Sequence, residues 1–198
     1  GNDTLNGGYY GDVMDGGEGD DVIGADANNI AGRSGTFSTS NTGMNLVNTL
    51  IGGKGNDTLH GSMYGDVYHF SLGDGHDTII ETSYRNGTQA NMVDRLVFDS
   101  SVTKEMVNLV RESNDVILQI NGGTDSIRIQ GWFNDSNSTR ALDRVEFADG
   151  TVWDTATLEA MALNAKGTEG NDSITGHTSR QNVISSLEGN DVITGGHL

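Results

Sequence analysis

Two stretches of the chain, residues 1–80 and 167–198, repeat one short pattern of apolar and polar positions. In each copy a large apolar residue stands between two smaller or polar residues, and a hexapeptide rich in Gly, Asn and Asp precedes it. The alternation predicts a very short strand with one inward side chain, and the polar hexapeptide predicts a turn. Such a regular period indicates stacked strand–turn units.

The repeated unit is Gly-Gly-x-Gly-x-Asp-x-U-x, in which U is a large apolar residue. Near-complete copies occupy residues 16–24, 52–60, 72–80, 167–175 and 186–194, and the opening GNDTLN is the end of another copy. Weaker copies occupy residues 7–15, 43–51, 61–69 and 177–185. Ordinary Gly-Asn-Asp turns would explain a single copy, but five near-complete copies favour a true repeat.

Each turn carries the chemistry of a cation site. Its glycines permit positive φ and can aim carbonyl oxygens inward, and the Asp at the sixth position adds a carboxylate. Calcium takes six to eight hard oxygen ligands in loose geometry. Two repeats make one coil, so turns on the same edge are about 18 residues apart, and we expect an ion between them.

Three pairs of well-formed turns have this spacing, and each pair is expected to hold one calcium ion. Asp3 and Asp21 are 18 residues apart, Asp57 and Asp77 are 20 apart, and Asp172 and Asp191 are 19 apart. The carbonyls expected to complete the sites belong to neighbouring glycines: Gly17, Gly19, Gly53, Gly55, Gly73, Gly75, Gly170 and Gly189.

The intervening turns are degenerate and predict a second edge that binds calcium weakly or not at all. Tyr10 and Tyr64 stand where the pattern requires Gly, and a bulky residue disfavours positive φ. Asp12 and Asp66 remain as weaker candidate ligands, but Asn48, which precedes Asp66 by 18 residues, is neutral.

The middle of the chain, residues 81–166, has no nonapeptide repeat. Apolar alternation predicts strands at 95–98, 106–110, 116–120, 126–130 and 144–147. Asn121-Gly122-Gly123 predicts a hairpin, and residues 154–165 predict a short helix with Asp154 as its N-cap. The expected domains are a roll at 1–80 with a polar excursion at 25–42, a β-rich capping segment at 81–166, and a truncated second roll at 167–198.

Composition supports a requirement for cations. The chain has a formal net charge of −17, only 34% hydrophobic residues and no Cys. Low hydrophobicity with high net charge would by itself predict a disordered chain, so bound divalent ions must offset the acid if the chain folds. The acidic balance also argues against nucleic acid as a partner, and no apolar stretch is long enough for a transmembrane segment.

The repeats resemble those of RTX (repeats-in-toxin) haemolysin-type calcium-binding proteins. In the middle segment, YHFSLGDGHDTI, DRLVF, DSIRIQGWF and VEFADGTVW resemble the haemolysin-type calcium-binding-related domain. The resemblance implies an all-β parallel β-roll, type I secretion, and folding on extracellular calcium. It also implies a structural module within a larger parent chain, a toxin or adhesin that is secreted or held at the bacterial cell surface.

The alternatives to a structural module are an enzyme and a ligand-binding module. The chain has no G-x-S-x-G, H-E-x-x-H or P-loop motif, so we expect that it is not an enzyme. A module that binds carbohydrate or peptide, such as a host-cell glycan, is the alternative, because Trp132, Phe133 and Trp153 could stack on a sugar. We expect these aromatic side chains to cover the end of the roll instead.

Overall fold

The computed structural model describes residues 1–8, 11–25, 47–62, 64–81, 93–134, 142–166, 170–171, 173–176 and 181–195. Within these ranges the chain is built of strands, one α-helix, α1 (Thr155–Leu163), and two 3-10 turns, η1 (Lys104–Met106) and η2 (Asn121–Gly123). The predicted all-β parallel roll with one short helix is confirmed.

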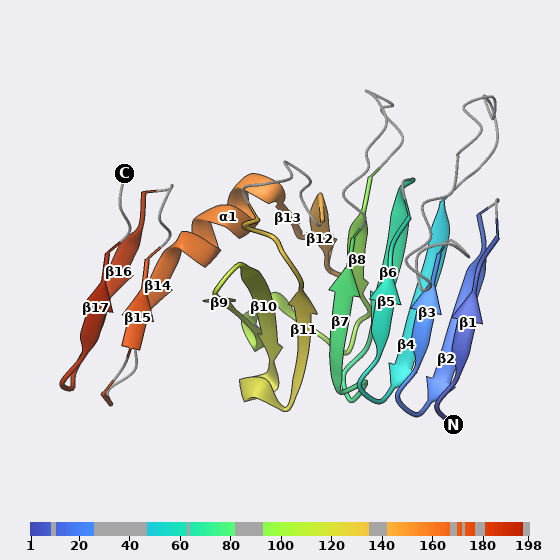
Figure 1. Cartoon of the computed structure of the whole chain (residues 1–198), viewed down its shortest axis with the longest axis horizontal. Helices are drawn as coiled ribbons and strands as arrows, with labels where there is room; N and C mark the ends of the chain where they lie inside the picture. The colour runs from blue at the N-terminus through green and yellow to red at the C-terminus, as the bar shows by residue number, and fades with distance from the viewer. Residues whose placement is uncertain are drawn as a thin grey trace.

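Two sheets face each other in the larger part of the molecule (Figure 1). The first contains, in spatial order, β1 (Thr4–Asn6), β3 (Val22–Gly24), β5 (Thr58–His60), β7 (His76–Ile80), β11 (Asp125–Ile129), β10 (Asp115–Ile120) and β9 (Val107–Glu112). The second contains β13 (Val152–Asp154), β12 (Arg144–Glu146), β8 (Arg95–Phe98), β6 (Asp66–Phe70), β4 (Asn48–Lys54) and β2 (Val13–Glu18).

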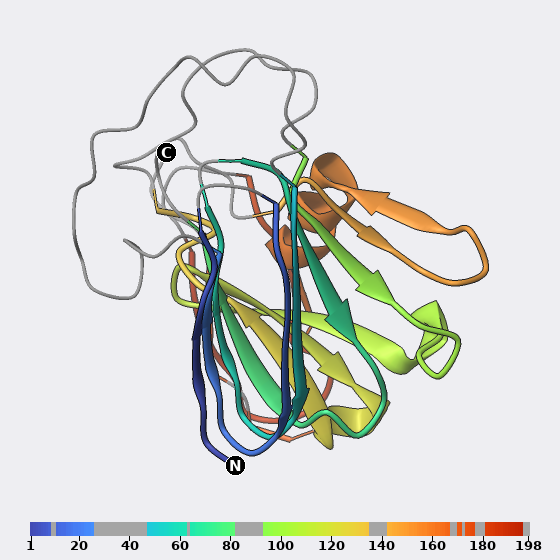
Figure 2. The same ribbon diagram turned by 90° about the vertical axis from the view of Figure 1, so that its right-hand side faces the viewer.

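The chain alternates between the two sheets, so that each coil contributes one strand to each sheet (Figure 2). Neighbouring coils pair in parallel, and this parallel stacking continues past residue 81, because β8 pairs with β6 and β11 pairs with β7. Antiparallel strands then close the stack: β10 and β9 on the first sheet, and β13 on the second.

The apolar residue of each repeat forms the core. In the first sheet these residues are in register along the stack: Leu5, Ile23, Leu59, Ile79 and Ile129. In the second sheet the matching row is Met14, Leu50, Tyr68, Leu96 and Val145. All of these side chains are buried except Leu5, which is partly buried in the first coil. A strand of only three residues is therefore anchored by one side chain.

The elements predicted for the middle segment are present. The five predicted strands correspond to β8, β9, β10, β11 and β12. β10 and β11 form the predicted antiparallel hairpin. The Thr157 N–H donates to Asp154 Oδ1 at 2.8 Å, which confirms Asp154 as the N-cap of α1.

The three aromatic side chains considered for sugar binding pack in the core. Trp132 and Phe133 are 6% and 5% exposed. Trp153 is partly buried and lies edge-on to Phe147, with ring centroids 4.7 Å apart. This arrangement supports the packing role expected for them.

A second, smaller roll follows the helix. It consists of β14 (Asn164–Lys166), β15 (Ser173–Thr175), β16 (Val183–Ser185) and β17 (Val192–Thr194), with β14 parallel to β16 and β15 parallel to β17. It begins at Asn164 rather than at residue 167. The described part of this roll has only two coils, and the inward residue of the last one, Ile193, is 48% exposed.

Truncating a core residue of the roll should destabilise it far more than truncating an exposed residue. Leu59 is 2% exposed and Val152 is 51% exposed. We expect Leu59→Ala to lower the free energy of unfolding by about 2–5 kcal/mol, because it leaves a cavity between the sheets. The matched Val152→Ala should change it by less than about 0.5 kcal/mol. Denaturant unfolding at saturating calcium measures both, and similar losses from the two variants would contradict the proposed core.

Candidate metal centre

The turns on one edge of the larger roll stack backbone on backbone. Gly53 has φ 91°, and a Cβ added to it would lie 2.1 Å from the carbonyl oxygen of Gly17 in the turn below. Glycine is therefore required there both for its conformation and for the close approach. This stacking sets the sixth-position Asp of each turn directly against the Asp of the next.

Four aspartates form a continuous hydrogen-bonded series along this edge, here called the first carboxylate row: Asp3, Asp21, Asp57 and Asp77. The backbone N–H of each donates to Oδ1 of the following one, at 2.6 Å, 2.6 Å and 3.0 Å in turn. The row fixes the carboxylates of Asp21, Asp57 and Asp77 by one oxygen each, Oδ1.

The other carboxylate oxygens, Oδ2, of Asp21 and Asp57 are the strongest indication of a cation. Asp21 and Asp57 are each 1% exposed, and within the described structure their Oδ2 atoms accept no hydrogen bond. A buried anionic oxygen without a donor is costly. A Cβ added to Gly16 would lie 2.3 Å from Asp21 Oδ2 and 2.7 Å from the Gly52 carbonyl oxygen. Only glycine therefore leaves room where these two oxygens converge, and an oxygen-rich cradle of this kind suits calcium.

The pKa values of two aspartates in the first row are raised, which also indicates buried carboxylate charge without a balancing cation. Burial, more than the neighbouring Asp57, Asp74 and Asp125 carboxylates, raises the pKa of Asp77 to about 8. Burial is also the main cause of the raised pKa of Asp57, to which the charge of Asp21 adds. Without a bound cation these carboxyl groups hold protons at a pH where an ordinary Asp is ionised.

The row joins turns that the sequence analysis had treated as two separate pairs. Asp3 is next to Asp21, and Asp57 is next to Asp77, as predicted. Asp21 is also next to Asp57, 36 residues later. This neighbour was missed because the sequence of residues 25–42 breaks the period of the repeat. The excursion predicted for these residues lies, apart from Ala25, outside the described part of the chain. The signal that could have revealed it is the spacing itself, which is twice the usual 18 residues.

The opposite edge carries a second carboxylate row: Asp12, Asn48, Asp66, Asp94 and Asp143. The Asp12 N–H donates to Asn48 Oδ1 at 3.0 Å, and Asn48 Nδ2 donates to Asp66 Oδ1 at 2.7 Å. The Asp66 N–H donates to Asp94 Oδ1, and the Asp94 N–H donates to Asp143 Oδ2, both at 2.9 Å. Each of these residues comes just before or at the start of a strand of the second sheet.

At Asp12 and Asp66 the second row differs from the first, because the chain itself supplies a donor to the remaining oxygen. Asp12 Oδ2 accepts from the Gly8 N–H at 2.6 Å, and Asp66 Oδ2 accepts from the Ser62 N–H at 2.6 Å. The pKa of Asp66 is nevertheless raised to about 6, because the residue is fully buried. These hydrogen bonds occupy oxygens that calcium would need at Asp12 and Asp66. Asp66 also forms a cluster with Glu81 and Asp94, whose carboxylate oxygens lie within 4.8 Å of one another. Weak calcium binding on this edge therefore stays a prediction.

Asp94 and Asp143 were missed as members of the second row. They lie in DRLVF and DRVEF, for which the sequence analysis predicted strands that begin one residue after each Asp, and it assigned neither Asp to a cation site. Both segments keep the last part of the repeat, an Asp followed two residues later by a large apolar residue, without the glycine-rich turn. That remnant is the signal by which they could have been found.

The smaller roll repeats the arrangement of the first row in its described part. A Cβ added to Gly189, which has φ 120°, would lie 2.3 Å from the Gly170 carbonyl oxygen, and the Asn190 N–H donates to Asn171 Oδ1 at 2.8 Å. Asp172 lies outside the described residues. Calcium binding between Asp172 and Asp191 therefore stays a prediction.

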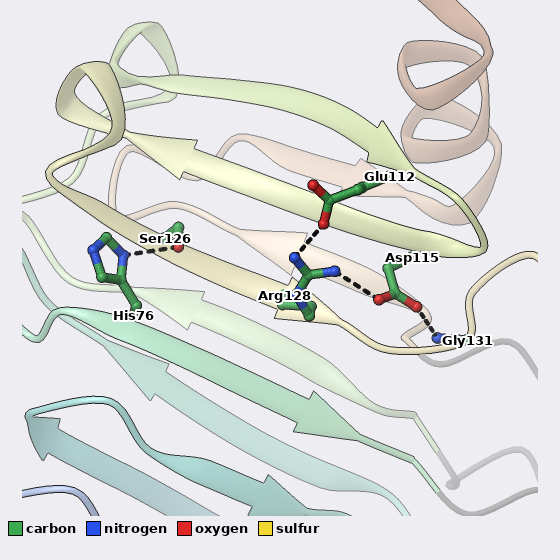
Figure 3. A network of polar contacts seen from close by, with 6 residues as sticks. All are labelled: His76, Glu112, Asp115, Ser126, Arg128 and Gly131. Carbon is green, nitrogen blue, oxygen red and sulfur yellow. Dashed lines mark hydrogen bonds and ion pairs between the residues drawn. The ribbon is translucent and has the colours of Figure 1, made fainter. Parts of the chain in front are cut away.

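A polar network on the outer face ties the β9–β10–β11 meander together (Figure 3). Arg128 on β11 pairs with Asp115 at 2.7 Å and with Glu112, and Asp115 also accepts from the Gly131 N–H. His76 on β7 lies 3.0 Å from the Ser126 hydroxyl. Exposed pairs of this kind contribute about 0–1 kcal/mol, so the main effect of the network is to orient the strands of the meander.

The fold and the first carboxylate row define a parallel β-roll whose turns are built to hold cations. Comparison with known families agrees: residues 1–29, 42–63, 164–180 and 178–197 match the RTX calcium-binding nonapeptide repeat, and residues 115–157 match the haemolysin-type calcium binding protein related domain. These matches confirm the resemblance of the repeats to the first family and of the middle segment to the second.

A curated relative is the iron-regulated protein FrpA of Neisseria meningitidis serogroup C. It is 28% identical to this chain over 107 residues, which cover 54% of the chain but 9% of the relative. The similarity therefore concerns a small part of that much longer protein. Among the described residues, no helix is long and apolar enough to cross a membrane.

Neutralising one carboxylate on each edge should affect calcium affinity very differently in the two rows. Asp57→Asn keeps an oxygen for the Asp21 N–H but removes the charge beside the donor-free Oδ2. We expect it to weaken calcium binding at least about tenfold, about 1.4 kcal/mol. The matched Asp12→Asn should leave calcium affinity within about twofold, because Asp12 Oδ2 is already bonded to Gly8. Isothermal titration calorimetry measures both, and equal losses would contradict the assignment.

Calcium binding should compete with protonation of Asp77. Its folded pKa, about 8, is above the unfolded value, so in the absence of calcium it stabilises the fold most at low pH, and this contribution is lost as the pH rises towards 8. Calcium needs the ionised form. We expect calcium affinity to rise between pH 6 and pH 8, by up to about tenfold per pH unit, with measurable proton release. Affinity that does not change over this range, or that changes equally in Asp77→Asn, would rule out this competition.

Proposed function

We propose that this chain is a calcium-dependent structural module of a larger secreted bacterial protein. The observation that supports it best is the pair of buried, donor-free Oδ2 atoms of Asp21 and Asp57. Neighbouring turns meet at these atoms, so an ion bound there would hold successive coils together. Coordination that is absent in the unfolded chain contributes directly to folding.

The proposed ions lie in the intervals of the first carboxylate row, between Asp3 and Asp21, Asp21 and Asp57, and Asp57 and Asp77, with one more between Asp172 and Asp191. Glycine carbonyls of the turns would supply further oxygens at each interval. Four divalent ions would add +8 and bring the net charge from −17 to −9. This partial neutralisation would remove much of the self-repulsion that opposes the compact state.

The cellular location and the parent protein of the module are proposed from the calcium dependence of its folding. A chain that folds on calcium stays unfolded where calcium is scarce and folds where it is abundant, which suits type I secretion and a role outside the cell or at the bacterial surface. We propose a toxin or an adhesin as the parent protein and a non-catalytic role for this part of it.

Binding of carbohydrate or peptide is the competing function, and the structure offers it little support. Of the three aromatic side chains that could have stacked on a sugar, Trp132 and Phe133 are almost completely buried and Trp153 is partly buried. A glycan array probed with the calcium-loaded chain would separate the two functions, since specific binding would favour the alternative.

The experiment that tests the proposal is a calcium titration followed by circular dichroism and thermal unfolding. In excess chelator we expect most of the β signal to be lost and to return on adding calcium. Magnesium should restore much less of it, because it is smaller and demands near-octahedral geometry. A β signal and a melting temperature that do not respond to chelator would contradict the proposal.

A further inference from the structure

In the described part of the larger roll, residues 72–77 form the last glycine-rich turn of the first carboxylate row. In the earlier turns a backbone N–H donates to the next turn. Gly19 donates to the Lys54 carbonyl at 2.8 Å, and Gly55 donates to the Asp74 carbonyl at 2.7 Å. Beyond the last turn, the strand that lies beside β7 is β11 of the β9–β10–β11 meander (Figure 1). The meander therefore occupies the place that a further repeat would take.

The first two residues of β11 hold this last turn. Asp125 is 6% exposed, and its Oδ2 accepts from the Gly73 N–H at 2.9 Å, across 52 residues of chain. The Ser126 N–H donates to the Gly75 carbonyl at 2.8 Å, so the backbone of β11 is fixed on the same turn. A buried carboxylate from the meander thus replaces an acceptor that the next turn would have supplied.

The hydrogen bond to Asp125 also sets the direction of the Leu72 carbonyl. Leu72 and Gly73 share one peptide group, and none of the described peptide bonds is cis. In a planar trans peptide the N–H and the C=O point in opposite directions. Because the Gly73 N–H points toward β11, the Leu72 carbonyl points back toward the preceding turn, residues 52–57.

The preceding turn carries the buried, donor-free Oδ2 of Asp57. One interval earlier, a carbonyl at the first position of the repeat meets such an oxygen. A Cβ added to Gly16 would lie 2.3 Å from Asp21 Oδ2 and 2.7 Å from the Gly52 carbonyl oxygen, so these two oxygens converge. Leu72 has the same position in its repeat as Gly52 has in its own. The Leu72 carbonyl therefore faces Asp57 Oδ2 in the same way.

We propose that Asp125 is a positioning residue for calcium bound between Asp57 and Asp77. By accepting from the Gly73 N–H, it aims the Leu72 carbonyl at the ion. The inference rests on the proposed calcium binding and extends it to β10 and β11, which lie in the segment that matches the related domain. Calcium binding in the last turn and docking of the meander are thus coupled through one buried carboxylate.

Two substitutions of Asp125 separate its hydrogen bond from its charge. Asp125→Ala removes the acceptor and should weaken the binding of one calcium ion about tenfold, with the other ions within about twofold of wild type. Asp125→Asn keeps an oxygen for the Gly73 N–H and should stay within about threefold. Asp115→Ala is the matched control, because Asp115 also accepts a glycine N–H, from Gly131 at 2.8 Å, but lies at the end of β10 away from Asp125. Isothermal titration calorimetry measures all four proteins.

Tryptophan fluorescence tests the coupling separately. The two tryptophans of the chain, Trp132 and Trp153, both lie in the segment that matches the related domain. Their fluorescence should change as the ion between Asp57 and Asp77 binds, and in Asp125→Ala the calcium midpoint of this change should rise by the same factor of about ten. A purely structural role for Asp125 would lower the melting temperature and leave the calcium midpoint where it is.

Two results would overturn the inference while leaving calcium binding by the chain intact. They are unchanged calcium affinities in Asp125→Ala, and a loss in Asp125→Asn as large as that in Asp125→Ala. A wild type that binds no calcium would overturn the proposed function itself. If Asp125→Ala does not reach the wild-type β signal at saturating calcium, hydrogen exchange of wild type provides the test. The Gly73 amide should gain protection at the calcium concentration where the fluorescence changes, and protection in excess chelator would contradict the coupling.

Discussion

The whole structure depends on one constraint, the burial of stacked carboxylates at the edges of the roll. A strand of three residues buries one large side chain, so the coils must stack closely to make a core, and close stacking brings the aspartates of successive turns together. Buried like charges without partners would unfold the chain. Every turn must therefore provide something that balances its carboxylate.

The two edges of the roll meet this constraint in different ways. In the second row, Gly8 and Ser62 donate to the second oxygens of Asp12 and Asp66, and the neutral Asn48 separates the two acids. In the first row the backbone donates to one oxygen of Asp21 and of Asp57, and their other oxygen accepts no hydrogen bond from the described residues. The edge that carries Asp12 and Asp66 is thus held by hydrogen bonds at these two residues, and we propose that the glycine-rich edge binds ions.

The sequence alone predicted the structure correctly where the repeat is regular. The spacing of Asp57 and Asp77, the inward apolar residues and the N-cap Asp154 were all predicted correctly, because each depends on local pattern alone. The contact of Asp21 with Asp57 could not be predicted from the sequence. The two turns are separated by a segment that lacks the repeat, and no local sequence rule fixes the length of such a segment. Asp94 and Asp143 were missed because their place in the second row depends on sheet register, which appears only when the strands are assembled.

The central proposal is that cations bind along the first row and not at Asp12 or Asn48 of the second. The most direct measurement is anomalous scattering from crystals grown at saturating calcium, which locates each ion independently of the protein density. The account predicts ions at Asp3, Asp21, Asp57 and Asp77, and none at Asp12 or Asn48. Ions of equal occupancy along both edges would contradict it, because they would show that the hydrogen bonds from Gly8 and Ser62 do not replace calcium.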